Sequence, residues 1–350
     1  MIQSDVKIGG SVICNGKTPF LVAEAGINHN GDLEKAFEMI RIAKEAGVDA
    51  IKFQTFKAEE FINDRNQTYT YVSQGKETTE SMLDMFNRYE FSASEWRAIR
   101  EQCGKMDISF LSTPQNRSDL DLLLELGIPA IKVGSDDLTN LPLLGDYARE
   151  MLPLILSCGM SDLSEVHEAL EAAGFFDGHP TILLLCTSLY PTPPADVHLR
   201  RLRTLQRAFP GLPVGFSDHT QGHVAACSAV AMGACFCEKH FTLDNSLPGP
   251  DHWFSANPKC LVDWTVAIRT AYQMLGCGFV RPTRQELLHR EEYRRVIVAS
   301  RDIRAGDMLT EVMLCMKRVP GGKGLAPRYM ELLLGRPARR DYLQGDAVEV

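Results

Sequence analysis

One pattern recurs along most of this chain of 350 residues: a short apolar run, a loop and then a longer amphipathic segment. The pattern repeats eight times, and the expected strands are Phe20–Glu24, Ala50–Gln54, Ile108–Thr113, Ala130–Gly134, Leu154–Ser157, Ile182–Thr187, Pro213–Ser217 and Cys235–His240. The runs are mostly apolar, as in strands that helices cover on both faces. Eight alternations over about 255 residues predict an α/β fold, the (β/α)8 TIM barrel. An open doubly wound sheet is the alternative, but the Gly-rich nucleotide turn typical of it is not seen.

Helical spacing is found in the segments between these runs, at Leu33–Ala46, Ala93–Lys105, Arg117–Leu126, Leu163–Ala173, Leu199–Phe209, Gly222–Met232 and Ala256–Leu275. A polar insertion, Lys57–Phe91, interrupts the repeat. It is too long for an ordinary loop, so we expect either a lid or a short subdomain there.

The pattern changes after Gly276. The segment Arg281–Arg295 is charged and has helical character, and the residues beyond it are rich in Gly and Pro, which predicts short strands and turns. We assign residues 1–280 to the barrel, 281–293 to a linker and 294–350 to a small, mostly-β domain. That last segment carries 11 basic and 7 acidic residues, although the whole chain has a net charge of -8.

Composition excludes several classes of function. The acidic balance argues against a protein that coats nucleic acid or an anionic membrane, which would favour a basic surplus. The start of the chain lacks the features of a signal peptide, and no apolar run approaches the roughly 20 residues that span a bilayer. The ten cysteines form no CxxC pair and are expected to be reduced thiols. We therefore expect a cytoplasmic protein with no nucleic-acid or membrane partner.

Polar residues stand at nearly every expected strand end, where the active sites of TIM barrels lie. They include Glu24, Lys52, Gln54, Thr113, Lys132, Ser135, Ser157, Ser188, Tyr190, Ser217, Glu238, Lys239 and His240. A buried lysine loses several kcal/mol of hydration unless an anion partners it. The lysines inside strands therefore indicate an anionic ligand or internal carboxylates. Phosphoenolpyruvate fits such a pocket, and so do many sugar phosphates.

Two histidines stand at adjacent strand ends, because His219 follows the seventh expected strand and His240 ends the eighth. Neutral imidazole is a common ligand of divalent metals, so the pair is a candidate metal site. Two hydrogen-bonded structural histidines are the alternative.

The strand-end motifs together resemble the sialic acid synthase (nonulosonate synthase) family. The matching segments are AEAGINHNGD (Ala23–Asp32), IKFQ (Ile51–Gln54), STP (Ser112–Pro114), IKVGS (Ile131–Ser135), LSCGMS (Leu156–Ser161), CTSLYPTP (Cys186–Pro193), GFSDHT (Gly215–Thr220), EKHFTLD (Glu238–Asp244) and GPDHWFS (Gly249–Ser255). RDIRAGDMLT (Arg301–Thr310) and KRVPGGKGLAP (Lys317–Pro327) resemble the SAF, or antifreeze-like, domain that follows the barrel in this family.

The resemblance implies a metal-dependent condensation of phosphoenolpyruvate with an N-acetylated hexosamine. The product would be a nine-carbon 2-keto-3-deoxy sugar acid of the sialic acid type, made for surface or spore-coat polysaccharide, together with phosphate. The acceptor would be N-acetylmannosamine or a diacetamido-trideoxyhexose. Two alternatives are a related synthase or metal aldolase that uses a sugar phosphate, and a non-catalytic carbohydrate-binding protein.

The resemblance also implies roles for individual residues. His219 and His240 would hold Mn²⁺ or Mg²⁺, Glu24 would handle a proton or orient the reactants, and Asp251 would bind a sugar hydroxyl. The residues that would contact phosphoenolpyruvate, the intermediate or the sugar are Lys52, Gln54, Thr113, Lys132, Ser135, Asp137, Ser157, Ser188, Tyr190 and Ser217, with Lys239 as a further candidate.

The family typically forms a domain-swapped homodimer, in which the SAF domain of one chain caps the barrel of the other. Arg318 matches the arginine that contacts the sugar's acyl group. The sequence departs from the family pattern at three positions: Asp136 stands where glycine is usual, Leu189 replaces Glu, and Val319 is inserted before Pro320. These departures concern the identity of the aminosugar more than the reaction.

Overall fold

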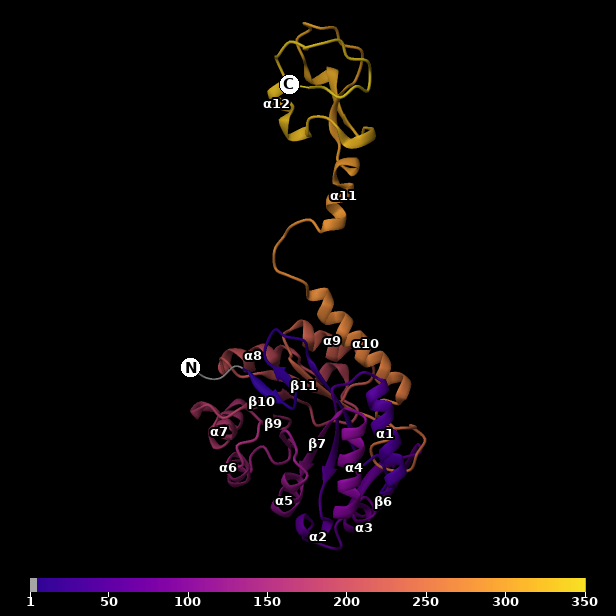
Figure 1. Ribbon diagram of the computed structural model, residues 1–350, viewed down its shortest axis with the longest axis vertical. Helices are drawn as coiled ribbons and strands as arrows, with labels where there is room; N and C mark the ends of the chain where they lie inside the picture. Colours follow the sequence, from indigo (N-terminus) through magenta and orange to yellow (C-terminus); the bar gives the residue numbers. More distant parts are fainter. Residues whose placement is uncertain (1–4, 350) are drawn as a thin grey trace. The chain divides into compact units, whose positions relative to one another are not determined.

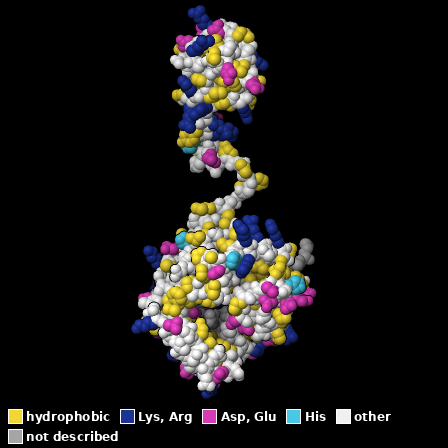
Figure 2. All heavy atoms as spheres, turned by 180° about the vertical axis from the view of Figure 1, so that it is seen from behind, with side chains coloured by type: hydrophobic (Ala, Val, Ile, Leu, Met, Phe, Trp, Pro, Cys, Tyr) yellow, Lys and Arg dark blue, Asp and Glu magenta, His cyan; other side chains and the backbone are white. Residues whose placement is uncertain are grey.

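The computed structural model describes residues 5–349, which form two compact units divided at Gly276. We call residues up to Gly276 the barrel unit and those from Cys277 onward the C-terminal unit. Within the residues described, no helix is long and apolar enough to cross a membrane. The face shown in Figure 2 carries interspersed basic and acidic side chains and a hollow in the barrel unit.

Eight parallel strands form the centre of the barrel unit. They are β3 (Phe20–Gly26), β4 (Ala50–Thr55), β7 (Ser109–Pro114), β8 (Ile131–Val133), β9 (Leu154–Ser157), β10 (Thr181–Leu185), β11 (Val214–Asp218) and β12 (Phe236–His240). Their order is β7-β4-β3-β12-β11-β10-β9-β8, and β7 and β8 lie next to each other where the sheet closes. The last strand pairs with the first, with His240 opposite Glu24. The predicted TIM-type fold is confirmed.

Helices surround these strands, as Figure 1 shows. They are α1 (Leu33–Glu45), α4 (Ala93–Lys105), α5 (Arg117–Glu125), α6 (Leu141–Ala148), α7 (Leu163–Ala172), α8 (Arg200–Ala208), α9 (Val224–Ala231) and α10 (Pro258–Leu275). Side-chain caps fix several of their starts, for example Asp32, which accepts hydrogen bonds from Glu34 N and Lys35 N. Short 3-10 turns lie at Phe175–Asp177 and Pro194–Asp196.

An N-terminal hairpin closes one end of the barrel. Strands β1 (Val6–Ile8) and β2 (Ser11–Ile13) pair antiparallel. Val6, Ile8 and Ile13 are buried in one apolar cluster with inward-facing residues near the strand starts, such as Phe20 and Phe236. The sequence did not predict this hairpin. It leaves only the opposite end, where the strands finish, available for polar side chains.

The insertion between Lys57 and Phe91 is a short subdomain with its own secondary structure. It contains α2 (Ala58–Phe61), the antiparallel hairpin β5 (Thr68–Ser73) and β6 (Lys76–Ser81), and α3 (Met82–Asn87). The tip of the hairpin is tied to the β12–α10 loop, because Gln74 Nε2 donates to Ser246 O at 2.9 Å and Gly249 N donates to Ser73 Oγ at 3.1 Å.

The C-terminal unit begins with α11 (Arg284–Tyr293). Its two short strands, β13 (Val296–Ala299) and β14 (Leu314–Lys317), pair antiparallel, and α12 (Met330–Leu333) lies near the end. The 3-10 turns are Glu311–Met313, Pro320–Gly322 and Pro327–Tyr329. A small core holds these pieces together, built from Ile297, Ala299, Ile303, Leu309, Leu314, Leu333, Ala338, Tyr342 and Val348.

Candidate active site

The carboxyl ends of the eight strands converge on a cavity of about 680 Å³. Strand alternation explains which side chains reach it: Lys52 and Gln54 point into the barrel, whereas Ile51 and Phe53 pack against the helices. The residues expected from the sequence that line this cavity are Glu24, Lys52, Gln54, Thr113, Lys132, Ser135, Ser157, Ser188, Tyr190, Ser217, His219 and His240.

Two lysines and two glutamates form a charged array at the bottom of the cavity. Lys52 Nζ lies 2.5 Å from Glu24 Oε2 and 3.7 Å from Glu238 Oε2. Lys132 Nζ lies 3.8 Å from Glu238 Oε1. The lysines that suggested an anionic ligand are thus partnered by internal carboxylates, the second of the two explanations left open by the sequence. Equal numbers of positive and negative charges allow all four groups to be buried.

Hydroxyl groups surround this array. Lys132 Nζ donates to Ser157 Oγ at 2.8 Å, and Lys52 Nζ donates to Thr113 Oγ1 at 3.3 Å. Ser217 Oγ donates to Glu238 Oε1 at 3.3 Å. Hydroxyls both donate and accept hydrogen bonds, so they can turn toward an arriving anion without leaving a buried donor unpaired.

Burial and the neighbouring charges move the pKa values of these groups in different directions. Burial raises the pKa of Glu24 to about 7, against the opposing effect of Lys52. Burial also acts to raise the pKa of Glu238, but Lys132 and Lys52 outweigh it, and the pKa of Glu238 lies below its usual value. Near neutral pH, Glu24 is therefore the group of the two that exchanges a proton.

The two histidines expected to bind a metal lie side by side, with ring centroids 5.4 Å apart. His219 Nδ1 is 2.8 Å from Thr187 O, a contact in which the ring N–H donates, and Nε2 lies 3.3 Å from Ser217 Oγ. His240 Nδ1 is buried and has no hydrogen-bond partner among the described residues, 3.9 Å from Asp251 Oδ2. Burial, reinforced by His219, holds the pKa of His240 well below its usual value, so this ring is neutral.

A neutral imidazole with an unpaired buried nitrogen is a suitable ligand for a divalent cation, so the residues present fit Mn²⁺ or Mg²⁺. Among residues 5–349, no three His, Cys, Asp or Glu side chains gather as a metal cage. Any cation held by the histidine pair would therefore keep positions for water and substrate.

Three of the expected site residues do not line the cavity. Asp137 Oδ1 accepts a hydrogen bond from Asn140 Nδ2 at 3.1 Å and is turned toward the start of α6. Asp251 lies beside His240, and burial raises its pKa to about 6. Arg318 belongs to the C-terminal unit, where its Nε donates to Tyr293 O at 3.0 Å.

Lys239, the further candidate, faces away from the cavity. Its Nζ lies 3.0 Å from Asp218 Oδ2, which also accepts a hydrogen bond from Trp264 Nε1 at 3.0 Å. The ion pair joins β12 to β11, and the hydrogen bond from Trp264 joins α10 to the same carboxylate. Lys239 therefore stabilises the barrel and is not a contact of the cavity.

Several lining residues were not assigned a role from the sequence. Glu238 was visible as a polar strand end, but its place between the two lysines was not. Phe56, Phe61, Tyr69 and Phe86 form an aromatic wall that comes from β4's end and the insertion. Asp136 also lines the cavity. Only the fold of the insertion brings Phe61, Tyr69 and Phe86 here, so no local sequence signal could have identified these three.

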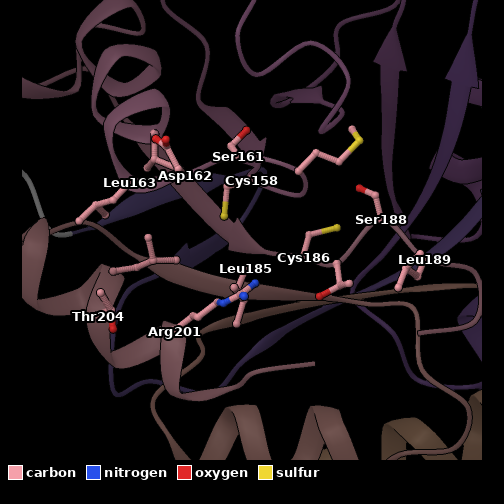
Figure 3. Close-up of a pocket in the computed structure, with 14 residues that line it drawn as sticks. Cys158, Ser161, Asp162, Leu163, Leu185, Cys186, Ser188, Leu189, Arg201 and Thr204 are labelled. Atoms are coloured by element: carbon pink, nitrogen blue, oxygen red, sulfur yellow. The ribbon is translucent and has the colours of Figure 1, made fainter. Parts of the chain in front are cut away.

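A second cavity of about 560 Å³ adjoins the first, and Met160, Cys186 and Ser188 line both. Figure 3 shows Arg201 and Thr204 of α8 on its side away from Ser188, and Ser161, Asp162 and Leu163 near the start of α7. The active-site cavity thus continues sideways between the loops that follow β9 and β10.

Comparison with known proteins agrees with this geometry. Residues 39–279 match the NeuB family and residues 294–348 match the SAF domain. The N,N'-diacetyllegionaminic acid synthase of Legionella pneumophila is 39% identical over 331 residues, covering 93% of this chain and 91% of that protein. The human N-acetylneuraminate-9-phosphate synthase is 33% identical over 336 residues, covering 94% and 89%.

Solved structures agree as well. The N-acetylneuraminic acid (sialic acid) synthetase of Leptospira borgpetersenii, crystallised with citrate, superposes with a TM-score of 0.73 at 32% identity, covering 83% of this chain and 96% of that one. The expected resemblance is confirmed along nearly the whole length. The chain belongs to the NeuB family, is an enzyme of the acid-synthase type and ends in a SAF domain.

Proposed function

We propose that this enzyme condenses phosphoenolpyruvate with the open-chain form of an N-acetylated hexosamine. The product is a nine-carbon 2-keto-3-deoxy sugar acid for surface or spore-coat polysaccharide, released with inorganic phosphate. The observation that carries this proposal is the buried array of Glu24, Lys52, Lys132 and Glu238 directly below a pair of histidines.

Phosphoenolpyruvate binds at the bottom of the cavity in this proposal. Its phosphate and carboxylate accept hydrogen bonds from Lys52, Lys132 and the surrounding hydroxyls of Thr113, Ser135, Ser157, Ser188 and Ser217. The ammonium groups are already held in place by Glu24 and Glu238. Little side-chain entropy is then lost when the anion binds, which favours a defined orientation of carbon 3.

The histidine pair stands where the sugar's aldehyde would meet carbon 3. A divalent cation, Mn²⁺ or Mg²⁺, bound by His219 and His240 would polarise the aldehyde carbonyl. Carbon 3 of phosphoenolpyruvate forms the new C–C bond to the aldehyde carbon, and the aldehyde oxygen takes up a proton. Water then adds at carbon 2, and breaking of the C–O bond expels phosphate to leave the 2-keto group.

Glu24 is suited to the proton steps. Its pKa of about 7 means that both protonation states are populated near neutrality. Gln54 Nε2 donates to Glu24 Oε1 at 3.3 Å and orients the carboxyl group. Glu24 can therefore donate a proton to the aldehyde oxygen or accept one from the attacking water.

The sugar would lie above, against Tyr190, Asp251 and the aromatic wall. The Tyr190 ring is 4.2 Å from that of His219 and 5.5 Å from that of His240, so it flanks the reacting aldehyde. Carboxylates such as Asp251 accept hydrogen bonds from sugar hydroxyls, and aromatic faces pack against the apolar faces of a sugar.

We also propose a domain-swapped homodimer, in which Arg318 on the C-terminal unit of one chain reaches the sugar on the other. Within the C-terminal unit, α11 buries none of its side chains, and Leu287 and Leu288 are exposed. An isolated helix of ten residues is marginal in water, which favours a partner surface for α11.

The two alternatives are less well supported. A second phosphate would need another cationic site within the barrel unit, but among the described residues that line this cavity only Lys52 and Lys132 are basic, and both are already paired with glutamates. A purely carbohydrate-binding role would not require a buried array of four charges, which costs stability.

Mass spectrometry of the product tests the proposal. The protein is incubated with phosphoenolpyruvate, Mn²⁺ and either N-acetylmannosamine or a 2,4-diacetamido-2,4,6-trideoxyhexose. We expect a product whose mass equals the sum of both substrates and water less phosphoric acid. Absence of any such adduct across the full set of sugars would contradict the proposed reaction.

A further inference from the structure

The loop that follows β8 carries two adjacent carboxylates, and they face different surroundings. Asp137 is engaged by Asn140 at the start of α6, where Asn140 N also donates to Asp137 O at 3.1 Å. Asp136 lines the active-site cavity. The acidic side chain that this loop offers to a ligand is therefore Asp136.

The carboxylate of Asp136 is free to accept hydrogen bonds. Among residues 5–349, no donor bonds to it and no basic side chain pairs with it. It folds back over Gly134, where an added Cβ would lie only 2.1 Å from Asp136 Oδ1. Gly134 thus leaves room for this position of Asp136, and a larger residue there would displace it.

Among the described residues that line this cavity, no lysine or arginine lies in its upper part. The two lysines of the lining lie at the bottom, each about 3% exposed and already paired with glutamates. Aromatic rings and the Asp136 carboxylate therefore line the cavity away from its charged bottom.

We propose that Asp136 is a specificity-determining residue, which accepts hydrogen bonds from hydroxyl or acetamido N–H groups of an uncharged aminosugar and disfavours an acceptor that carries a phosphate. This inference rests on the proposed function and deepens it, because membership of the family leaves open whether the acceptor is phosphorylated. An uncharged sugar supplies several donors to a free carboxylate. A phosphate dianion in the same cavity is repelled by the carboxylate, and both lysines of the lining are already paired with glutamates.

Steady-state kinetics of variants tests the proposal. The acceptors are N-acetylmannosamine and N-acetylmannosamine 6-phosphate, each varied at saturating phosphoenolpyruvate and Mn²⁺. We expect wild type to prefer the uncharged sugar. Asp136→Asn should lower kcat/KM for the uncharged sugar about tenfold, since one charge-assisted hydrogen bond becomes a neutral one. Asp136→Gly, which restores the glycine usual at this position, should do the same.

The selectivity ratio is kcat/KM for the uncharged sugar divided by kcat/KM for the phosphorylated sugar. A change in this ratio distinguishes a specificity role from a purely structural one. In both variants kcat/KM for the phosphorylated sugar should rise or stay constant, so that the ratio falls at least tenfold, while the KM for phosphoenolpyruvate stays within twofold. Asp263→Asn removes the same charge from the exposed face of α10 and should leave the ratio unchanged.

A ratio within twofold of wild type in both Asp136 variants would overturn the inference, and so would a wild-type preference for the phosphorylated sugar. Either result would leave the condensation itself intact. A wild-type protein that releases no phosphate with any acceptor would instead contradict the proposed function, and the inference with it.

Discussion

Gly215 occupies a position in β11 where no side chain fits. A Cβ there would lie 2.6 Å from Leu184 Cδ2 and 2.6 Å from Phe236 O, both on neighbouring strands. Gly215→Ala should therefore lower the free energy of unfolding by about 1–3 kcal/mol, the usual cost of overpacking a core. Urea denaturation measures the change.

Gly145→Ala is the matched control for this prediction. Gly145 lies in α6, and its added Cβ would meet nothing closer than Ala172 O at 3.8 Å. Alanine is the better helix former, so this variant should be as stable as wild type or more stable, by up to about 1 kcal/mol. Equal destabilisation by both substitutions would contradict the close packing around Gly215.

His219 gives a second prediction at the level of single residues. His219→Ala removes one of the two proposed ligands and should abolish both turnover and tight Mn²⁺ binding, measured by calorimetry on the folded protein. His223→Ala is the control, because His223 lies four residues on in the same loop and is exposed. Normal Mn²⁺ affinity in His219→Ala would remove this residue from the ligand set.

The alternation of side chains along a strand decided how much of the site could be predicted. In CFCEKH, Glu238 and His240 face the barrel interior, so Lys239 between them must face the helices. That assignment was available from the sequence. The sequence could not predict that Asp136 lines the cavity and Asp137 does not, because this difference depends on the hydrogen bond that Asn140 donates to Asp137.

The helices and strands that were missed have weak local signals. Helix α6 has the sequence LPLLGDYA, in which Gly disfavours a helix interior, whereas Pro is tolerated because it lies in the first turn. The helix begins where Asn140 accepts a hydrogen bond from Leu143 N. Strands β1 and β2 have only three residues each and are stabilised by burial at the barrel end. The eight strands were predictable because their apolar runs recur at regular intervals, each followed by a segment with helical spacing.

Helix α5 carries a pH-dependent contribution to stability. Asp119 Oδ2 accepts from Asn116 N at 3.0 Å and from Asn116 Nδ2 at 2.9 Å. Burial raises the pKa of Asp119 to about 6, so the folded state holds the proton more tightly than the unfolded state. The contribution of this group is fully present below pH 4 and is lost as the pH rises through 6.

Asp119→Asn removes this titration but keeps an oxygen that can accept from Asn116 N. Wild type loses the stabilising contribution of protonated Asp119 as the pH rises, whereas the variant does not. The free energy of unfolding of the variant minus that of wild type should therefore increase by about 2 kcal/mol between pH 4.5 and 7.5. Urea unfolding across this range measures it. A difference that does not vary with pH would show that Asp119 titrates alike in both states.

For the whole molecule, the proposed exchange of C-terminal units makes one active site depend on two chains. At a low sugar concentration, Arg318→Ala should have low activity because it lacks a contact with the sugar. His219→Ala should have low activity because it lacks a proposed metal ligand. After subunit exchange, half of the dimers are hybrids, and each hybrid has one site with an intact barrel and an intact Arg318. Mixing the variants should then restore about a quarter of the sites.

Native mass spectrometry of the mixture provides the control, because it reports whether hybrid dimers have formed. If hybrids form and activity stays at the sum of the separate variants, Arg318 acts within its own chain or not at all. Wild type that stays monomeric at the assay concentration would contradict the dimer itself.

The central claim is a condensation that consumes phosphoenolpyruvate only when an acceptor sugar and a divalent metal are present. Release of inorganic phosphate from phosphoenolpyruvate measures it most directly, with Mn²⁺ and a set of N-acetylated hexosamines, before and after chelation of the metal. We expect release that requires the sugar, stops on chelation and returns when Mn²⁺ is restored. Sugar-independent release, or none with any sugar in the set, would contradict the account.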